Sequence, residues 1–118
     1  MKLTINTNGI VKNTGIVYVL LIYLEDKELV KIGITTGKVE DRVVSILKSI
    51  WARYREFPKC IVKRYRTTED IRAKEKELHA LFNEKRYKTQ FTFDGSTEFF
   101  DITVDEVVEA YDNRIPKQ

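Results

Sequence analysis

One acidic residue occupies a position where a charge is costly. From residue 71 to residue 82, Ile71, Glu75, Leu78 and Phe82 follow one another at intervals of four, three and four. In a helix these intervals place all four side chains on one face, so the carboxylate of Glu75 would point inward with its apolar neighbours. A buried carboxylate needs a metal ion, a positive side chain or hydrogen-bond donors. Glu75 is therefore a candidate catalytic residue and metal ligand, and a structural ion pair is the alternative.

Arg42 repeats this anomaly on an earlier segment with helical spacing. It lies three residues after Val39 and four residues before Ile46, on the side expected to face the core. A guanidinium group there could clamp a phosphate or stabilise charge on it. The alternative is an arginine whose stem covers the core while its head reaches water or pairs with an acid.

Tyr18 and Lys31 fall in two apolar segments that read as strands. Tyr18 could donate to, or accept from, a reacting oxygen. Lys31 lies between Val30 and Ile32 on a strand expected to be central, and a desolvated lysine has a lowered pKa that suits a general base. The alternatives are a core tyrosine and an outward-facing lysine on an alternating strand.

The remaining candidates are a histidine and a group of basic residues. His79 follows Glu75 by about one helical turn, so it could act as a base or support a metal ligand, unless it is simply a packed histidine. Trp51 and Tyr54 alternate with basic residues in an arrangement that can stack on nucleobases, although a core tryptophan beside a basic surface explains it equally. The candidates for contact with a nucleic acid are Arg42, Lys48, Arg53, Arg55, Lys63 and Arg64.

The elements that must position these residues alternate between strands and helices. Runs of β-branched and aromatic residues predict strands over residues 16–23, 29–34 and 60–65, the first two joined as an antiparallel hairpin by the polar turn 25–27. Helical spacing predicts helices over 39–53, from a cap at Thr67 or Thr68 to about residue 85, and over 103–111 behind a capping box, with a short extended piece at 98–102. The order indicates an α+β fold with a small sheet flanked by helices. We expect one domain over residues 1–118, with a core of about 15–102 and a polar N-terminal arm or edge strand.

Composition excludes several classes of site. The chain has 118 residues, one cysteine (Cys60) and one histidine, so neither an internal disulfide nor a zinc cage of several Cys and His residues can form. The longest apolar run, residues 16–24, is shorter than the roughly 20 residues of a membrane-spanning helix and lacks a signal-peptide cleavage pattern. We expect a cytoplasmic location.

Charge is distributed unevenly along the chain. Residues 42–66 contain eight Lys or Arg and one acid, whereas residues 94–118 contain seven acids and two basic residues. A basic middle segment suits a polyanion at one surface, and two oppositely charged, solvated faces are the alternative.

The candidate residues occur in an order that resembles a known family. Gly15-Ile16-Val17-Tyr18, Lys31-Ile32-Gly33, Arg42 and the helix-borne Glu75 resemble the pattern of the GIY-YIG nuclease superfamily, and Glu75-x-x-Leu78-His79-x-x-Phe82 and Glu98-Phe99-Phe100 are similar to its short phage-type branch. The resemblance implies a three-stranded antiparallel sheet flanked by helices, with Mg²⁺ or Mn²⁺ on Glu75. It also implies that Tyr18 and Lys31 handle the attacking water and that Arg42 braces the phosphate. Tyr23 is a second choice for Tyr18, and Asn83 is a candidate for a late asparagine found in other branches.

Three functions follow from these observations. The first is a metal-dependent endonuclease that hydrolyses DNA, with RNA as an alternative substrate and with any sequence specificity supplied by a protein partner. The second is a nucleic-acid-binding module without catalytic activity. The third is a phage or host subunit that contacts other proteins, in which case the acidic C-terminal part would be the contact surface.

Overall fold

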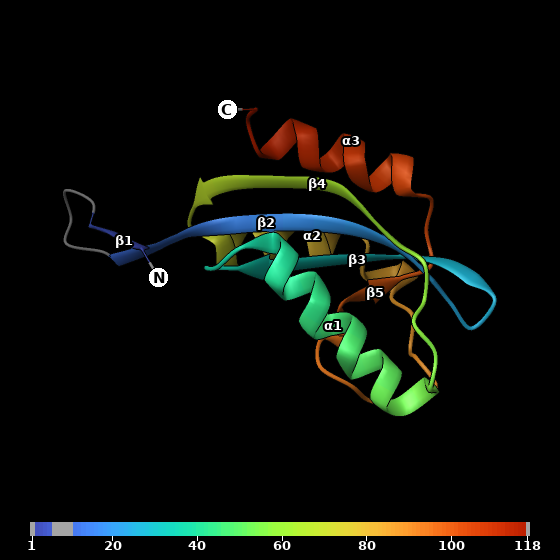
Figure 1. Ribbon diagram of the computed structural model, residues 1–118. Helices are drawn as coiled ribbons and strands as arrows, with labels where there is room; N and C mark the ends of the chain where they lie inside the picture. The colour runs from blue at the N-terminus through green and yellow to red at the C-terminus, as the bar shows by residue number, and fades with distance from the viewer. Residues whose placement is uncertain (1, 6–10, 118) are drawn as a thin grey trace.

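The longest strand, β2 (Val11–Leu24), forms the middle of the sheet and pairs with three other strands (Figure 1). The structure is a computed structural model that describes residues 2–5 and 11–117. Antiparallel partners of β2 are β1 (Lys2–Ile5), β3 (Lys27–Thr35) and β4 (Cys60–Glu69). The short β5 (Phe99–Phe100) pairs with β3.

The fold is α+β as predicted, but the expectation of a three-stranded sheet is wrong. Four strands follow one another in the order β1-β2-β3-β5, and β4 pairs with β2 in addition. The three predicted strands are the long ones. β5 has only two residues and lies within the short extended piece expected over residues 98–102. β1 lies in the N-terminal segment expected to be a polar arm or an edge strand, of which residues 1 and 6–10 fall outside the described residues.

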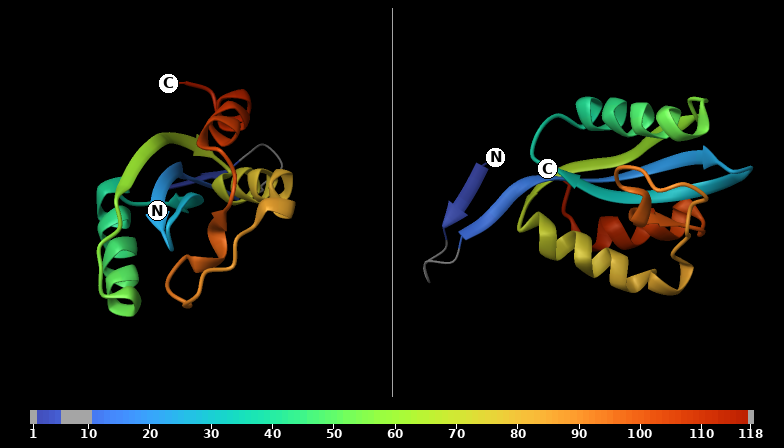
Figure 2. Two further views of the ribbon diagram at one scale, coloured as in Figure 1. Left: turned by 90° about the vertical axis from the view of Figure 1, so that its right-hand side faces the viewer. Right: turned by 90° about the horizontal axis from the view of Figure 1, so that it is seen from below.

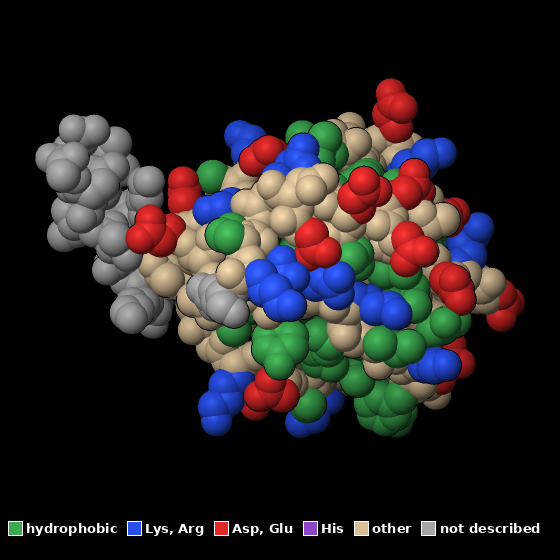
Figure 3. All heavy atoms as spheres, turned by 90° about the horizontal axis from the view of Figure 1, so that it is seen from above, with side chains coloured by type: hydrophobic (Ala, Val, Ile, Leu, Met, Phe, Trp, Pro, Cys, Tyr) green, Lys and Arg blue, Asp and Glu red, His purple; other side chains and the backbone are tan. Residues whose placement is uncertain are grey.

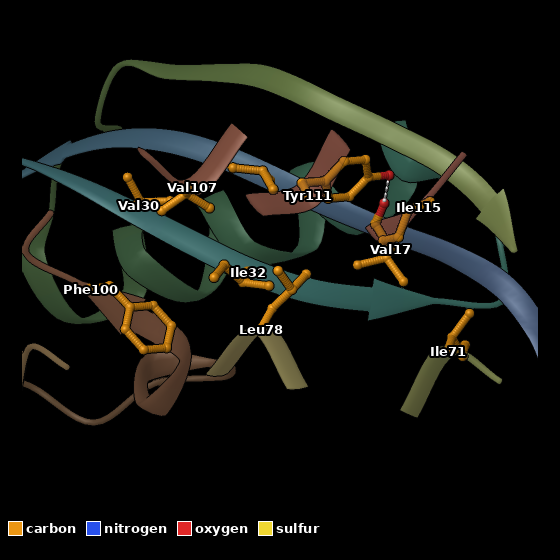
Figure 4. Packing of buried hydrophobic residues seen from close by; sticks show 10 residues of the cluster. Val17, Val30, Ile32, Ile71, Leu78, Phe100, Val107, Tyr111 and Ile115 are labelled. Carbon is orange, nitrogen blue, oxygen red and sulfur yellow. Dashed lines mark hydrogen bonds between the residues drawn. The ribbon is translucent and has the colours of Figure 1, made fainter. Parts of the chain in front are cut away.

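Helices cover both faces of the sheet (Figure 2). Helix α1 (Val39–Tyr54) packs on one face, and α2 (Ile71–Leu81) and α3 (Val104–Arg114) pack on the other. Alternation along β2 explains why both faces are apolar: Val17 and Val19 join the cluster under α2 and α3, whereas Tyr18 and Leu20 join the cluster under α1. In the first cluster the Tyr111 hydroxyl donates to the Val17 carbonyl at 2.7 Å and ties α3 to β2 (Figure 4).

The predicted hairpin is confirmed with a tight turn. Leu24 pairs with Lys27, and the two residues between them, Glu25 and Asp26, have φ values of 55° and 60°. Positive φ at both central residues gives the turn a twist that matches the strands it joins.

The predicted start of the second helix is wrong. Thr67 and Thr68 do not cap it, because β4 continues through both residues by pairing with Ile16 and Gly15 of β2. Helix α2 begins only at Ile71, and it ends at Leu81, before a 3₁₀ turn (Asn83–Lys85). The last helix extends to Arg114, beyond the predicted residue 111, and the capping pair is present as a 2.6 Å hydrogen bond from Thr103 Oγ1 to Glu106 Oε2. Within the described part of the chain, no helix is long and apolar enough to cross a bilayer.

Candidate active site

The candidate site lies at the edge of β3, where its partner strand stops. β5 pairs with Val30 and Lys31 and goes no further along β3. At the next residue, the Ile32 carbonyl accepts a 2.9 Å hydrogen bond from Nε2 of His79 on α2. The His79 side chain thus makes the hydrogen bond that a longer partner strand would make to Ile32. Because β5 extends no further along β3 than Lys31, side chains from both faces of the sheet can meet at this edge.

Tyr18 reaches this edge from the neighbouring strand. It pairs with Gly33 of β3, and a β-carbon at residue 33 would lie 2.3 Å from the Tyr18 hydroxyl oxygen, so the ring crosses over the glycine. The hydroxyl accepts a long hydrogen bond of 3.4 Å from Nε of Arg42. Burial raises the pKa of Tyr18 to about 12, against the opposing effect of Arg42. The hydroxyl therefore keeps its proton near neutral pH and can donate a hydrogen bond.

Arg42 comes from the first turn of α1 and is held by a loop. Its Nη1 donates to Asp94 Oδ2 at 2.7 Å, and this bond is the main reason that the pKa of Arg42 is raised. The Asp94 backbone N–H donates in turn to Ser49 Oγ of α1 at 3.0 Å. The Arg42 side chain is 24% exposed, so the guanidinium group lies at the surface beside the Tyr18 hydroxyl.

Lys31 is fully buried, which excludes the interpretation of an outward-facing lysine. Its Nζ donates to Oε1 of Glu98 and, at 3.2 Å, to the carbonyl of Gly95. Burial lowers the pKa of Lys31, and the Glu98 carboxylate acts in the opposite direction. Gly95 has a φ of 81°, and a β-carbon there would lie 2.5 Å from Nζ, so the loop passes as close to the lysine as a glycine allows.

Glu75 is partly buried and contributes an oxygen that lacks a hydrogen bond. Oε2 is the side-chain atom that is buried without a partner among the described residues. Burial, followed by the neighbouring Glu98, raises the pKa of Glu75 to about 7. An orphaned carboxylate oxygen in a polar setting fits a cation ligand. The described residues contain no cluster of three or more His, Cys, Asp or Glu side chains that could hold a metal, so any ion would rely mostly on water.

His79 and Glu75 line the same surface cavity, which has a volume of about 480 Å³. Because a carbonyl can only accept, the bond to Ile32 requires a proton on Nε2 and leaves Nδ1 of a neutral ring as an acceptor. Burial lowers the pKa of His79, which favours that neutral ring. The other residues that line the cavity are Lys76, Ala80, Asn83 and Arg86.

The structure thus brings together the five predicted catalytic residues, Tyr18, Lys31, Arg42, Glu75 and His79, from β2, β3, α1 and α2. Electrostatic effects on the pKa of Tyr18 come from Arg42, Glu98 and Glu75, in keeping with one shared site. Tyr23, the second choice for Tyr18, lies at the hairpin end beside Lys59 and is not part of it. Two residues of this site, Glu98 and Asp94, are not among the site residues predicted from the sequence. Glu98 belongs to the Glu-Phe-Phe motif, which was the available signal, and no local signal indicated Asp94.

The predicted basic residues do not form one surface. Lys48 and Arg53 are exposed on α1, and Arg55 is exposed at its C-terminal cap. Arg55 stacks over the ring of Trp51, which is 40% exposed and so not a core residue. Lys63 and Arg64 belong to β4, where Arg64 makes a bidentate pair with Asp112 of α3 at 2.9 and 3.0 Å. Arg66 also pairs with Asp112.

These ion pairs correct the expected separation of charge. The basic middle segment and the acidic C-terminal segment are apart in sequence, yet they meet through Arg42 with Asp94 and through Arg64 and Arg66 with Asp112. The view onto β4 and α3 accordingly shows basic and acidic side chains next to one another (Figure 3). The exposed basic residues on α1 remain the best candidates for contact with a polyanion.

Comparison with known proteins replaces the family inferred from the sequence pattern. The matching family model is the T5orf172 domain, over residues 15–114, and not a GIY-YIG nuclease, so the GIY-YIG assignment is corrected. No curated protein and no solved structure matches the chain. The matching family suggests a nuclease or DNA-binding role.

Proposed function

The chain belongs to the T5orf172 domain family, and we propose that it is a metal-dependent endonuclease that hydrolyses phosphodiester bonds of DNA. The observation that carries the proposal is the meeting of an arginine, a tyrosine, a buried lysine, a histidine and an unpaired carboxylate oxygen at one sheet edge. These groups can bind a phosphate, hold a cation and accept a proton, which are the requirements of phosphodiester hydrolysis.

Arg42 and Tyr18 would bind the scissile phosphate. The guanidinium group already makes a 2.7 Å bond to a carboxylate oxygen of Asp94, and a phosphate oxygen can replace that oxygen with similar geometry. The protonated Tyr18 hydroxyl lies beside it and would donate a hydrogen bond to the same phosphate or to the leaving oxygen. This pair supports binding of a phosphodiester rather than of an uncharged ligand.

Glu75 would hold the divalent cation, Mg²⁺ or Mn²⁺. Its unpaired oxygen fits a metal that keeps several waters and takes one or two carboxylates from the protein. When bound, such a cation supplies neutralisation of charge on the phosphate and the leaving oxygen.

His79 would handle the attacking water, and Lys31 would support the site from the interior. The geometry supports His79 as the base, because the bond to Ile32 leaves Nδ1 able to accept a proton. Lys31 donates to Glu98 and Gly95, which supports a role in holding the loop and in adding positive charge beneath the phosphate.

The test is cleavage of supercoiled plasmid with Mg²⁺, Mn²⁺ or EDTA, beside the variant Glu75→Ala. We expect cleavage that requires the metal and disappears in the variant. The matched control is Glu77→Ala, because Glu77 lies on the same helix with a side chain that is 57% exposed and pairs with Arg114. Equal loss in both variants would point to a damaged helix rather than to a lost metal ligand.

A nucleic-acid-binding module without catalysis is the second candidate function. The exposed Lys48 and Arg53 on α1 and Arg55 at its C-terminal cap favour it, because they can bind phosphates without any metal. It predicts salt-sensitive binding and no cleavage with either metal, on supercoiled, linear or single-stranded DNA or on RNA. That result would overturn the nuclease proposal.

A further inference from the structure

Glu98 lies close to two other charged groups of the site, Lys31 and Glu75. On one side it accepts a hydrogen bond from Nζ of Lys31, which is completely buried. On the other side it is close enough to Glu75 for its negative charge to raise the pKa of that carboxyl group. Its own side chain is 25% exposed, so it can be reached from solvent.

The backbone holds Glu98 in this place. The residue ends a 3₁₀ turn, Ser96–Glu98, in which its N–H donates to the Gly95 carbonyl at 3.1 Å. The next two residues form β5, which is paired with β3. Gly95 also accepts from Lys31, so both ends of the turn are tied to the strand that carries the lysine. The turn and β5 therefore hold the Glu98 side chain in a fixed position, which is what a metal ligand requires.

Two adjacent carboxylates are an unfavourable pair unless a positive charge lies between them. Lys31 neutralises Glu98 from the interior side and donates its hydrogen bonds to Glu98 and Gly95. Oε2 of Glu75 has no hydrogen-bond partner among the described residues. A second positive charge on the solvent side would satisfy that oxygen and remove the repulsion.

We propose that Glu98 is a second protein ligand of the cation, so that the ion is held between the carboxylates of Glu75 and Glu98. This inference rests on the proposed function, since it concerns the same metal site. Glu98 has two oxygens, so Oε1 can stay with Lys31 while the other faces the ion. Two carboxylates with the remaining positions filled by water and phosphate oxygens make a coordination shell that suits Mg²⁺ or Mn²⁺.

The test is direct binding of Mn²⁺ to the purified chain, measured by electron paramagnetic resonance of the free ion and without any nucleic acid. We expect one Mn²⁺ per chain for the wild type, binding weaker by about tenfold or more for Glu98→Gln, and similar or larger weakening for Glu75→Gln. Glu77→Gln should bind like the wild type.

A second variant distinguishes Glu98 as a ligand of the cation from Glu98 as only the ion-pair partner of Lys31. Glu98→Gln leaves the charge of Lys31 buried and could unfold the chain, whereas Lys31→Met with Glu98→Gln removes both charges. If Glu98 binds the ion, the double variant stays at least about tenfold weaker than Lys31→Met alone. If the double variant binds Mn²⁺ as tightly as Lys31→Met, Glu98 only neutralises the lysine and the inference is wrong.

The outcomes also separate this inference from the proposed function. Wild-type binding that is lost in Glu75→Gln and kept in Glu98→Gln overturns the role of Glu98 and leaves the metal site of the nuclease intact. No binding of millimolar Mn²⁺ by the wild type overturns both.

Discussion

The ring of Tyr18 lies across Gly33, its partner on the neighbouring strand, at a distance that no other residue type allows. A β-carbon at residue 33 would be 2.3 Å from the hydroxyl oxygen and 2.4 Å from Cζ of the ring. The ring is also fully buried in the cluster under α1, so moving it would disturb the packing there. Gly33 is therefore what allows a tyrosine hydroxyl to reach Arg42 at the edge of the sheet.

The variant Gly33→Ala is expected to displace the Tyr18 ring. Overpacking at a buried site should lower the free energy of unfolding by about 1–3 kcal/mol, and cleavage of plasmid DNA should fall with the loss of the contact to Arg42. Urea denaturation measures the first effect. The control is the same substitution in a Tyr18→Leu background, where the added methyl group should cost clearly less. An equal cost in both backgrounds would show that the clash is not with the tyrosine.

Under the proposed function, Asp94 would compete with a phosphate for Arg42. The pair is partly exposed, with side chains that are 24% and 58% accessible, so the contact contributes only modestly. We expect Asp94→Asn to bind a short DNA duplex about two- to fivefold more tightly at low salt, measured by fluorescence anisotropy. Asp101→Asn is the control, because it removes the same charge from an exposed pair with Lys27. Weaker binding by Asp94→Asn alone would mean that Asp94 holds Arg42 in its binding position.

The raised pKa of Glu75 predicts a dependence of stability on pH. The pKa is about 7 in the folded chain, mainly because of burial, and 4.5 in an exposed glutamate. Between these values the folded chain keeps a proton that the unfolded chain releases, so the free energy of unfolding falls as the pH rises through this window. The change is about 1–2 kcal/mol, because Glu75 is only partly buried.

Chemical denaturation in EDTA at several pH values measures this effect against Glu75→Gln. The variant has no proton to lose, so its stability relative to the wild type should increase from about pH 4.5 to about pH 7. Parallel curves for the two proteins across that window would contradict the assignment of the shifted group.

His79 has both a structural bond and a proposed chemical role, and one substitution separates them. In His79→Gln the side-chain amide can still donate to the Ile32 carbonyl, but it cannot accept a proton at Nδ1. We expect the melting temperature to change little and kcat for cleavage to fall about 100-fold, with loss of the acidic limb of the pH profile. Unchanged kcat in a folded variant would remove His79 from the mechanism.

Sequence patterns predicted the long elements of this fold because they are local. The hairpin β2–β3, helix α1 and the inward position of Glu75 on α2 follow from alternation or helical spacing within about ten residues. For Lys31 the strand pattern left two interpretations, a buried lysine and an outward-facing one, and the structure shows the buried one. The same patterns misplaced the start of α2, because pairing of Thr67 and Thr68 with a distant strand outweighed their preference for a helix cap.

The sequence by itself determined an α+β chain. It also placed Arg42 and Glu75 on apolar helix faces and Lys31 on a buried strand, because the direction of each side chain depends only on its position within its own helix or strand. Only the tertiary structure decided which groups touch. Lys31 meets Glu98 67 residues away, Arg42 meets Asp94 52 residues away, and Arg64 meets Asp112 48 residues away. No local rule encodes such pairs, because they depend on how the sheet edge, the loop before β5 and the C-terminal helix pack together.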